Sequence, residues 1–169
     1  MLLYSDILTG DELFSDAYPV TEVDGAYEVD CSMITVGGDD NFDIGANASA
    51  EEAAEELESS AQTVNNVVYS FRLVETNFDK KSYMTYIKGY MKALEAKMKE
   101  LEKPEAEIAD FKKSAATLVK KILGNIKDYE FYTGESMDPD GMVALLNYRE
   151  DGVTPYFTFF KAGVKSMKL

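Results

Sequence analysis

The chain has 169 residues, of which 46% are hydrophobic, so it can bury one full-sized core, and a second independent domain would be a tight fit. It contains no histidine and a single cysteine, which excludes Ser–His and Cys–His nucleophilic pairs, histidine-based zinc motifs and an internal disulfide. The formal net charge is −14, yet all 17 basic residues follow residue 71, so the acidic first part of the chain disfavours nucleic-acid binding.

Other classes of function also lack their signatures. No run of about 20 apolar residues and no charged-then-apolar leader occurs, so we expect neither a membrane span nor a secretory signal. Phosphate-binding loops ending in Gly-Lys-Ser or Gly-Lys-Thr and the GxGxxG pattern are missing. Carboxylate-only catalysis is compatible with the composition, but no pattern points to it. A cytosolic protein is expected, with its one thiol, Cys31, in the core of a strand.

The chain begins with a short apolar run, residues 2–8, which is typical of a strand. Residues 9–18 are dense in Asp, Ser and Gly, and this composition predicts a turn or a single helical turn. The dipeptide Asp24-Gly25 is the strongest local hairpin signal, because both turn positions must accept a positive φ and alternating runs flank it at residues 18–23 and 26–31. The second of these strands can continue through residues 33–36.

The stretch from residue 38 to residue 62 is strongly acidic, has no basic residue and contains few large apolar groups. Self-repulsion and the lack of apolar surface predict a mobile loop, although residues 49–57 could form a frayed helix behind a capping box. Calcium prefers several oxygen ligands, so this loop offers candidate ligands for a weak Ca²⁺ site: Asp39, Asp40, Asp43, Glu51 and Glu52. A solvated acidic linker is the alternative, since a mobile loop loses entropy with every ligand that it orders. No cofactor is required.

A valine-rich stretch, residues 63–74, predicts further strand, after which Asn77 or Asp79 can cap a helix. Two apolar seams with spacings of three and four residues then predict two antiparallel helices of about 22 residues, each about 33 Å long. The seams consist of Met84, Ile87, Met91, Leu94, Met98 and Leu101, and of Ile108, Phe111, Ala115, Leu118, Ile122 and Ile126. Lys103-Pro104 separates the helices, and the turn near residues 101–105 is expected to project beyond a small sheet.

Each predicted helix carries a basic stretch that can contact an acidic partner. The lysines are Lys80, Lys81, Lys88 and Lys92 on the first helix, and Lys112, Lys113, Lys120 and Lys121 on the second. An ordinary solvated helix face is the more common meaning of such charges, and the charge pattern alone leaves both interpretations open.

The last part of the chain is the most apolar and the richest in turn signals. Its periodicity predicts three strands of a β-meander, at residues 129–133, 142–148 and 156–160. The middle strand is apolar on both faces, which places it inside a covered sheet. The MDPDG segment predicts a turn, because the surrounding residues fit a calcium-binding EF-hand poorly. Glu135 follows an apolar strand and can be partly buried beside the acidic loop or Arg149, and a structural ion pair is expected there rather than a catalytic acid.

Several stretches together resemble the translationally controlled tumour protein family: MLLYSDILTGDELFSDAYPV, IGANASAEE, FYTGESMDPDGMVALLNYREDGVTPYFTFFKAG and the lysine-rich helical hairpin. The resemblance covers essentially the full length. It implies an α+β fold with a mixed, mostly antiparallel β-sheet core, the β-tent shared with Rab-GTPase accessory proteins. In this single compact domain the β-rich core spans residues 1–38, 63–78 and 129–169, the flexible acidic loop 39–62, and the inserted helical hairpin 79–128.

The resemblance also implies a function. It suggests a non-enzymatic cytoplasmic protein, partly associated with the cytoskeleton, that binds calcium and tubulin and takes part in microtubule stabilisation, protein synthesis and growth control. The implied partners are microtubules, a small GTPase and translation elongation factor components, without nucleic acid or membrane, and the eight lysines are the implied tubulin contacts.

Glu12 matches the family position proposed to act on a Ras-like GTPase, where a projecting acid can compete for the P-loop lysine or the metal site. The alternative is that Asp11 and Glu12 are solvent-exposed residues of a turn with no role in binding. A second possible function is therefore that of an exchange factor or nucleotide-free chaperone for a Ras- or Rab-like GTPase. An enzyme on the related methionine sulfoxide reductase fold is disfavoured by the lone cysteine and the missing histidine.

Overall fold

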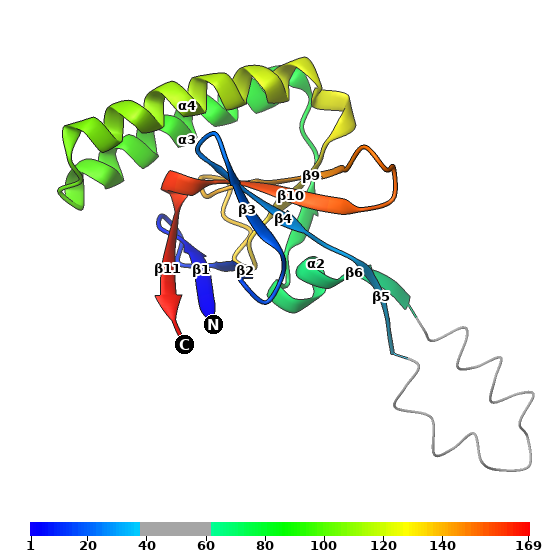
Figure 1. The fold of residues 1–169 in the computed structure, drawn as a ribbon. Coiled ribbons are helices and arrows are strands. Elements are labelled where there is room, and N and C mark those ends of the chain that lie inside the picture. Colours follow the sequence, from blue (N-terminus) through cyan, green and yellow to red (C-terminus); the bar gives the residue numbers. More distant parts are fainter. Residues whose placement is uncertain (38–61) are drawn as a thin grey trace, which may run out of the picture.

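The computed structural model describes residues 1–37 and 62–169, which form an α+β fold with two long helices and three antiparallel sheets (Figure 1). The predicted fold class is confirmed. The three-stranded sheet has the order β11-β1-β2, with strands Val164–Lys168, Leu2–Asp6 and Glu12–Ser15. The six-stranded sheet has the order β3-β4-β10-β9-β8-β7, with strands Val20–Val23, Ala26–Asp30, Pro155–Phe160, Ala144–Tyr148, Glu130–Thr133 and Val74–Thr76.

The three-stranded sheet corrects the expectation for residues 9–18, which contain strand β2 and are not limited to a turn or a helical turn. Burial explains the difference, because Leu13 and Phe14 are 1% and 0% exposed and draw the segment against the core. Strand β11 follows a short 3₁₀ turn, Lys161–Gly163, and pairs with β1. This strand was not predicted.

Local signals placed most of the six-stranded sheet correctly. Asp24 and Gly25 adopt φ angles of 47° and 81°, and the predicted hairpin joins β3 to β4. The predicted β-meander is formed by β8, β9 and β10, with β9 in the middle and Leu145 fully buried. Residues 33–36 form a separate strand, β5 (Met33–Val36), which pairs with β6 (Gln62–Asn65) in the two-stranded sheet.

The valine-rich stretch does not form one strand, as we expected, but is interrupted by helix α2, Asn66–Phe71. The side-chain oxygen of Asn65 accepts hydrogen bonds from the backbone N–H groups of Val67 and Val68, at 2.9 and 3.2 Å, and so caps the helix. Arg72 ends it in the left-handed region, with φ of 56°.

The predicted helical hairpin consists of α3 (Lys80–Glu100) and α4 (Glu105–Gly124), and a 3₁₀ turn at Ile126–Asp128 leads into β8. Asp79 caps α3 through a reciprocal capping box with Ser82. The predicted seam of α3 is correct at Ile87, Leu94 and Met98, which are buried, but wrong at Met84 and Leu101, which are 37% and 48% exposed. Tyr83 and Tyr90, which precede Met84 and Met91 in the chain, are buried in α3 instead.

Strand β10 lies between the helical hairpin and the three-stranded sheet (Figure 1). Phe159 stacks on Phe14 of β2 at 4.5 Å between ring centroids, whereas Phe160 contacts Tyr90 of α3 at 5.8 Å. Successive residues of a strand point to opposite faces, so these two phenylalanines anchor the two outer layers. The turn between α3 and α4 extends beyond the sheets, as expected (Figure 1).

Two further expectations concern the single cysteine and membrane-spanning helices. Cys31 is 7% exposed, which confirms a core thiol. None of the helices within residues 1–37 and 62–169 is both long enough and apolar enough to span a membrane.

Candidate functional site

Glu12 lies where β2 meets the loop between β8 and β9, and it is exposed as the first residue of its strand. The carboxylate of the preceding Asp11 accepts hydrogen bonds from the hydroxyl of Ser136 at 2.5 Å and from its backbone N–H at 3.3 Å. A side chain on Gly134 would collide with Asp11, so the close approach requires glycine. We term Asp11, Glu12, Gly134, Glu135 and Ser136 the β2 junction.

The buried carboxylate of Asp6 holds the segments of the β2 junction together. Asp6 is 2% exposed, and its two oxygens accept hydrogen bonds from the backbone N–H groups of Leu8 and Met142, each at 2.8 Å. Its own backbone N–H donates to the carbonyl of Asp11 at 2.8 Å. Because a buried carboxylate is stable only when such donors surround it, these bonds tie the β1–β2 turn to the β8–β9 loop and fix the position of Glu12.

The β2 junction is acidic, and one cation offsets part of its charge. Glu135 forms an ion pair with Arg72 at 3.0 Å, with side chains 59% and 76% exposed. The expected ion pair is therefore present, but Glu135 forms it with Arg72 and does not lie beside Arg149. The β9–β10 turn instead carries Arg149 to β4, where Glu28 and Asp30 bind it. The exposed Arg72–Glu135 pair contributes little stability in water, so both side chains can exchange partners.

All eight predicted lysines are exposed. Within the described part of the chain, one of them, Lys112, forms an ion pair, with its Nζ 2.6 Å from a carboxylate oxygen of Glu95. The hydrogen bond from Lys112 lowers the pKa of Glu95, and Lys99 adds to the effect. This ion pair joins α4 to α3 and takes Lys112 out of the set available to a partner.

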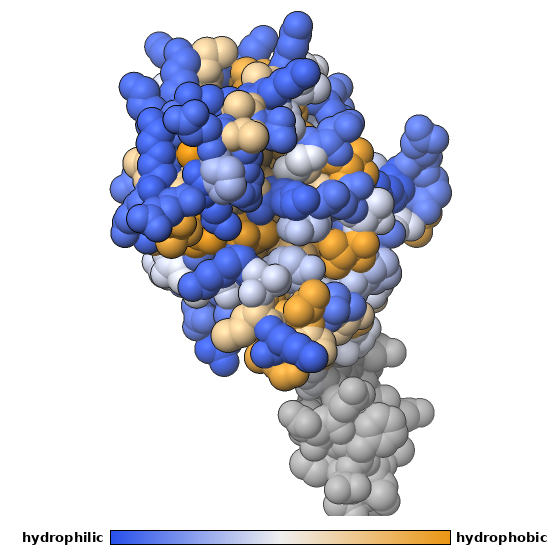
Figure 2. Space-filling view, turned by 60° about the vertical axis from the view of Figure 1, so that its left-hand side comes forward, coloured by the Kyte–Doolittle hydropathy of each residue, from blue (hydrophilic) through white to orange (hydrophobic). Residues whose placement is uncertain are grey.

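The eight lysines do not form one patch. On α3, Lys81, Lys88 and Lys92 are seven and four residues apart and so share one face of the helix, which we term the α3 stripe. On α4, Lys113 and Lys120 are seven residues apart and form the α4 stripe. Hydrophilic residues dominate the surface over the helical hairpin (Figure 2). The lysines that lie off the two stripes are Lys80, Lys112 and Lys121.

The predicted calcium ligands, Asp39, Asp40, Asp43, Glu51 and Glu52, lie outside the described residues. The predicted acidic loop is described only at its last residue, Gln62, which begins β6. Among residues 1–37 and 62–169, no group of three or more His, Cys, Asp or Glu side chains is arranged to hold a metal ion.

Comparisons with known proteins agree along the whole chain. The family model described as translationally controlled tumour protein matches residues 1–165. The chain belongs to this family. Its relatives include the translationally-controlled tumor protein homologs of Alternaria alternata and Schizosaccharomyces pombe, each 61% identical to it, with alignments that cover 100% and 99% of both chains, respectively.

Solved structures of translationally controlled tumour proteins support the same assignment. The translationally controlled tumor-associated protein of Schizosaccharomyces pombe superposes with a TM-score of 0.83 at 59% identity and covers 100% of both chains. The Caenorhabditis elegans translationally-controlled tumor protein gives a TM-score of 0.72 at 31% identity, over 100% of this chain and 99% of that chain. The family resemblance is thus confirmed, and this is not a known enzyme family.

The family resemblance offered Glu12 as a candidate, but the sequence did not indicate the residues that hold it in place. Ser136 lies 125 positions after Asp11, and Met142 lies 136 positions after Asp6, so no local sequence pattern predicts either contact. Arg72 is the first basic residue of the chain, which singles it out, but nothing near it in the sequence indicates a partner 63 positions later.

Proposed function

We propose that this member of the translationally controlled tumour protein family is a non-enzymatic interaction protein that binds microtubules through the α3 and α4 stripes. The supporting observation is that all five lysines of the stripes are exposed and that none is ion-paired within residues 1–37 and 62–169. Rigid helices that display such lysines suit a flexible acidic partner, and the acidic tails of tubulin have this chemistry.

The magnitude of the interaction follows from the charges. An exposed ion pair contributes about 0.2–1 kcal/mol, so five lysines support binding by a few kcal/mol in total. The net charge of −14 repels an acidic partner at long range, but at physiological salt charges are screened beyond about 8 Å. Binding is therefore local to the stripes, modest in affinity and weakened by added salt.

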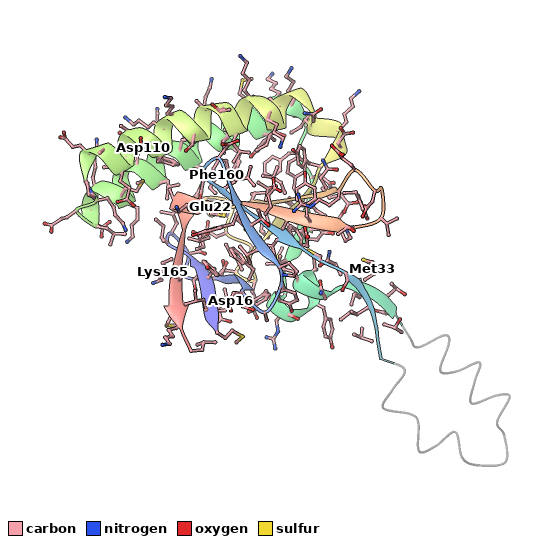
Figure 3. The ribbon with its side chains drawn as sticks, viewed as in Figure 1. Asp16, Glu22, Met33, Asp110, Phe160 and Lys165 are labelled. Carbon is pink, nitrogen blue, oxygen red and sulfur yellow. The ribbon has the colours of Figure 1, made fainter. Side chains whose placement is uncertain are left out.

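Co-sedimentation with microtubules tests the proposal. The variant Lys81→Glu/Lys88→Glu/Lys92→Glu reverses the α3 stripe, whereas Lys127→Glu/Lys165→Glu/Lys168→Glu makes the same charge change at exposed lysines outside α3 and α4. Figure 3 shows Lys165 on β11, well away from Asp110 of the helical hairpin. We expect the first variant to lose binding and the second to retain it. Equal loss in both variants, or binding that does not depend on salt, would contradict the proposal.

A second candidate function concerns a Ras- or Rab-like GTPase and rests on the β2 junction. Glu12 is exposed there on a support fixed by Asp6 and Asp11, as a projecting acid requires if it is to compete for a P-loop lysine or a bound magnesium ion. Nucleotide release from the GTPase is the readout. Acceleration that Glu12→Ala abolishes and Glu150→Ala, at another exposed acid, leaves intact would support this function, and equal rates would remove it.

The remaining roles come from the family and the sequence. We propose a cytoplasmic protein, partly cytoskeletal, with roles in protein synthesis and growth control that involve translation elongation factor components. Weak calcium binding by the acidic stretch is tested by calorimetry before and after Asp39, Asp40 and Asp43 are changed to asparagine. An unchanged isotherm would eliminate those three ligands.

A further inference from the structure

A groove of about 710 Å³ opens between helix α3 and strand β7. All three residues of β7 line one side, and small residues of α3, including Thr85, Gly89 and Ala93, line the other. The groove contains neither Glu12 nor any of the eight predicted lysines, so it is distinct from both surfaces of the proposed function. Its volume lies within the range of about 300–1,000 Å³ that is typical of ligand sites.

Strand β7 is the last strand of the six-stranded sheet and pairs only with β8 among the described strands. The backbone N–H and C=O groups of alternate residues in a strand point to opposite edges, so the outer edge of β7 presents groups that an added strand can pair with. A free edge beside a groove is the arrangement that binds extended peptides by strand addition, with the peptide's side chains in the groove.

Gly89 keeps the groove wide. It lies inside α3, where glycine weakens a helix relative to alanine. Its φ is not in the left-handed region, and a Cβ atom added to it would meet nothing within 4 Å. Neither backbone conformation nor packing requires glycine here, but any larger side chain would enter the groove. Glycine at this position therefore destabilises the helix locally but leaves the groove open.

The charges of the groove select the ligand. Its charged lining residues are both acidic: Asp140 of the β8–β9 loop, and Glu75 of β7. The carboxylate of Glu75 lies on the face of the strand opposite α3, where it accepts a hydrogen bond from the hydroxyl of Tyr132 at 3.4 Å. The hydroxyl of Tyr86 is engaged, because it donates to the carbonyl of Gly141 at 2.7 Å and accepts from the N–H of Val143 at 3.0 Å. The rest of the lining is mainly apolar or small. This combination suits apolar side chains flanked by a cation and disfavours an anion.

We propose that the groove binds an extended peptide segment of a partner protein, in which apolar residues are flanked by lysine or arginine, as an additional strand on β7. The peptide backbone pairs with the outer edge of β7, and every second side chain, which is apolar, lies against α3. The side chains between them, which include the basic residues, lie on the face of the sheet that carries Glu75.

The probe is a fluorescein-labelled pentapeptide, Lys-Val-Leu-Val-Lys with blocked ends, titrated with the full chain and followed by fluorescence anisotropy. We expect saturable binding, with amide chemical-shift changes at residues 74–76 and 89 in spectra of the ¹⁵N-labelled protein. Gly89→Leu fills the groove and should weaken binding about tenfold or more. Gly124→Leu is the matched control, because it makes the same change in α4 at a position that also has open space.

Two further peptides separate the parts of the proposal. A peptide that is N-methylated at all five residues has lost the backbone N–H groups that would donate to β7 and should not bind. A peptide with glutamates in place of the lysines should bind at least about tenfold more weakly. The proposal is overturned by a lack of saturable binding to the unmodified peptide, by equal binding of the N-methylated peptide, or by Gly89→Leu and Gly124→Leu behaving alike.

Discussion

Changing Tyr86 to phenylalanine should destabilise the fold far more than the same change at Tyr90, although both residues lie on α3 and each loses one oxygen atom. The Tyr86 hydroxyl connects α3 to the β8–β9 loop through its bonds to Gly141 and Val143. Burial raises the pKa of Tyr86 well above its usual value, so the hydroxyl stays protonated and continues to donate at neutral pH. Within residues 1–37 and 62–169, the buried hydroxyl of Tyr90 has no hydrogen-bond partner.

The expected changes in the free energy of unfolding follow from the backbone groups that lose their hydrogen-bond partner. Tyr86→Phe leaves the N–H of Val143, a residue that is 2% exposed, and the carbonyl of buried Gly141 without a partner. At about 1–1.5 kcal/mol for each lost hydrogen bond, the free energy of unfolding should fall by about 2–3 kcal/mol. For a chain of this size the Tm should fall by about 5–10 °C. Tyr90→Phe removes an unpaired buried hydroxyl, so its effect should range from none to about 1 kcal/mol of stabilisation.

Urea unfolding followed by circular dichroism measures both effects on one scale, provided that the m-values of the variants agree with that of the wild type. Tyr83→Phe provides a second comparison, since its buried hydroxyl also lacks a partner among the described residues. Equal losses for Tyr86→Phe and Tyr90→Phe, or a loss below about 0.5 kcal/mol for Tyr86→Phe, would refute the reasoning.

Three further predictions concern single residues. Hydrogen bonds from Ser82 lower the pKa of Asp79, so the stabilisation of the fold by the Asp79 carboxylate is present above its unfolded-state pKa and is lost as the pH falls through the lower folded-state pKa. Asp79→Asn should therefore flatten the pH dependence of the Tm below about pH 4. An unchanged profile of Tm against pH would count against this prediction. Burial raises the pKa of Cys31 to about 11, so an aromatic disulfide reagent at pH 8 should react with it only as the protein unfolds, and fast labelling of the native protein would disagree. Gly134→Ala should displace Asp11 and lower the Tm, whereas Gly124→Ala should raise it slightly; the reverse order would contradict the packing at the β2 junction.

Much of the sheet was predictable because local and tertiary preferences agree there. Asp24-Gly25 is a dipeptide that favours a tight turn locally, since both residues accept a positive φ, and the apolar run around Leu145 is stable when both faces are covered. The capping of α3 by Asp79 and the break at Pro104 are likewise encoded within a few residues.

Propensity and periodicity disagreed in the valine-rich stretch, and periodicity was the better guide. Val67, Val68 and Phe71 are spaced like one face of a helix, but the β-propensity of valine favoured a strand. The cap formed by Asn65 and the burial of Val67 resolve the conflict in favour of α2.

The burial of tyrosines on α3 was harder to predict because two seams one residue apart compete on the same helix. Met84 and Met91 are more apolar than Tyr83 and Tyr90, yet the aromatic rings fill the space beside Phe131 and Phe160. The polar sequence of β11 gives no strand signal, and its pairing with β1, at the opposite end of the chain, supplies the structure.

For the candidate site, the chemistry of individual residues was readable but their spatial grouping was not. The exposure of Glu12 and of the lysines follows from their charge. The contacts that position Glu12, and the separation of the lysines into two stripes and three outliers, depend on the fold, because they join residues that are distant in sequence or depend on the rotation of each helix about its axis.

Chemical-shift mapping with an acidic tubulin-tail peptide tests the central functional claim most directly. The ¹⁵N-labelled protein is titrated with the peptide at low and at physiological salt. Binding through the stripes predicts the largest shifts at Lys81, Lys88 and Lys92 on α3 and at Lys113 and Lys120 on α4, decreasing as salt is added. Shifts confined to β11 or the β2 junction, or no shifts at low salt, would contradict the account.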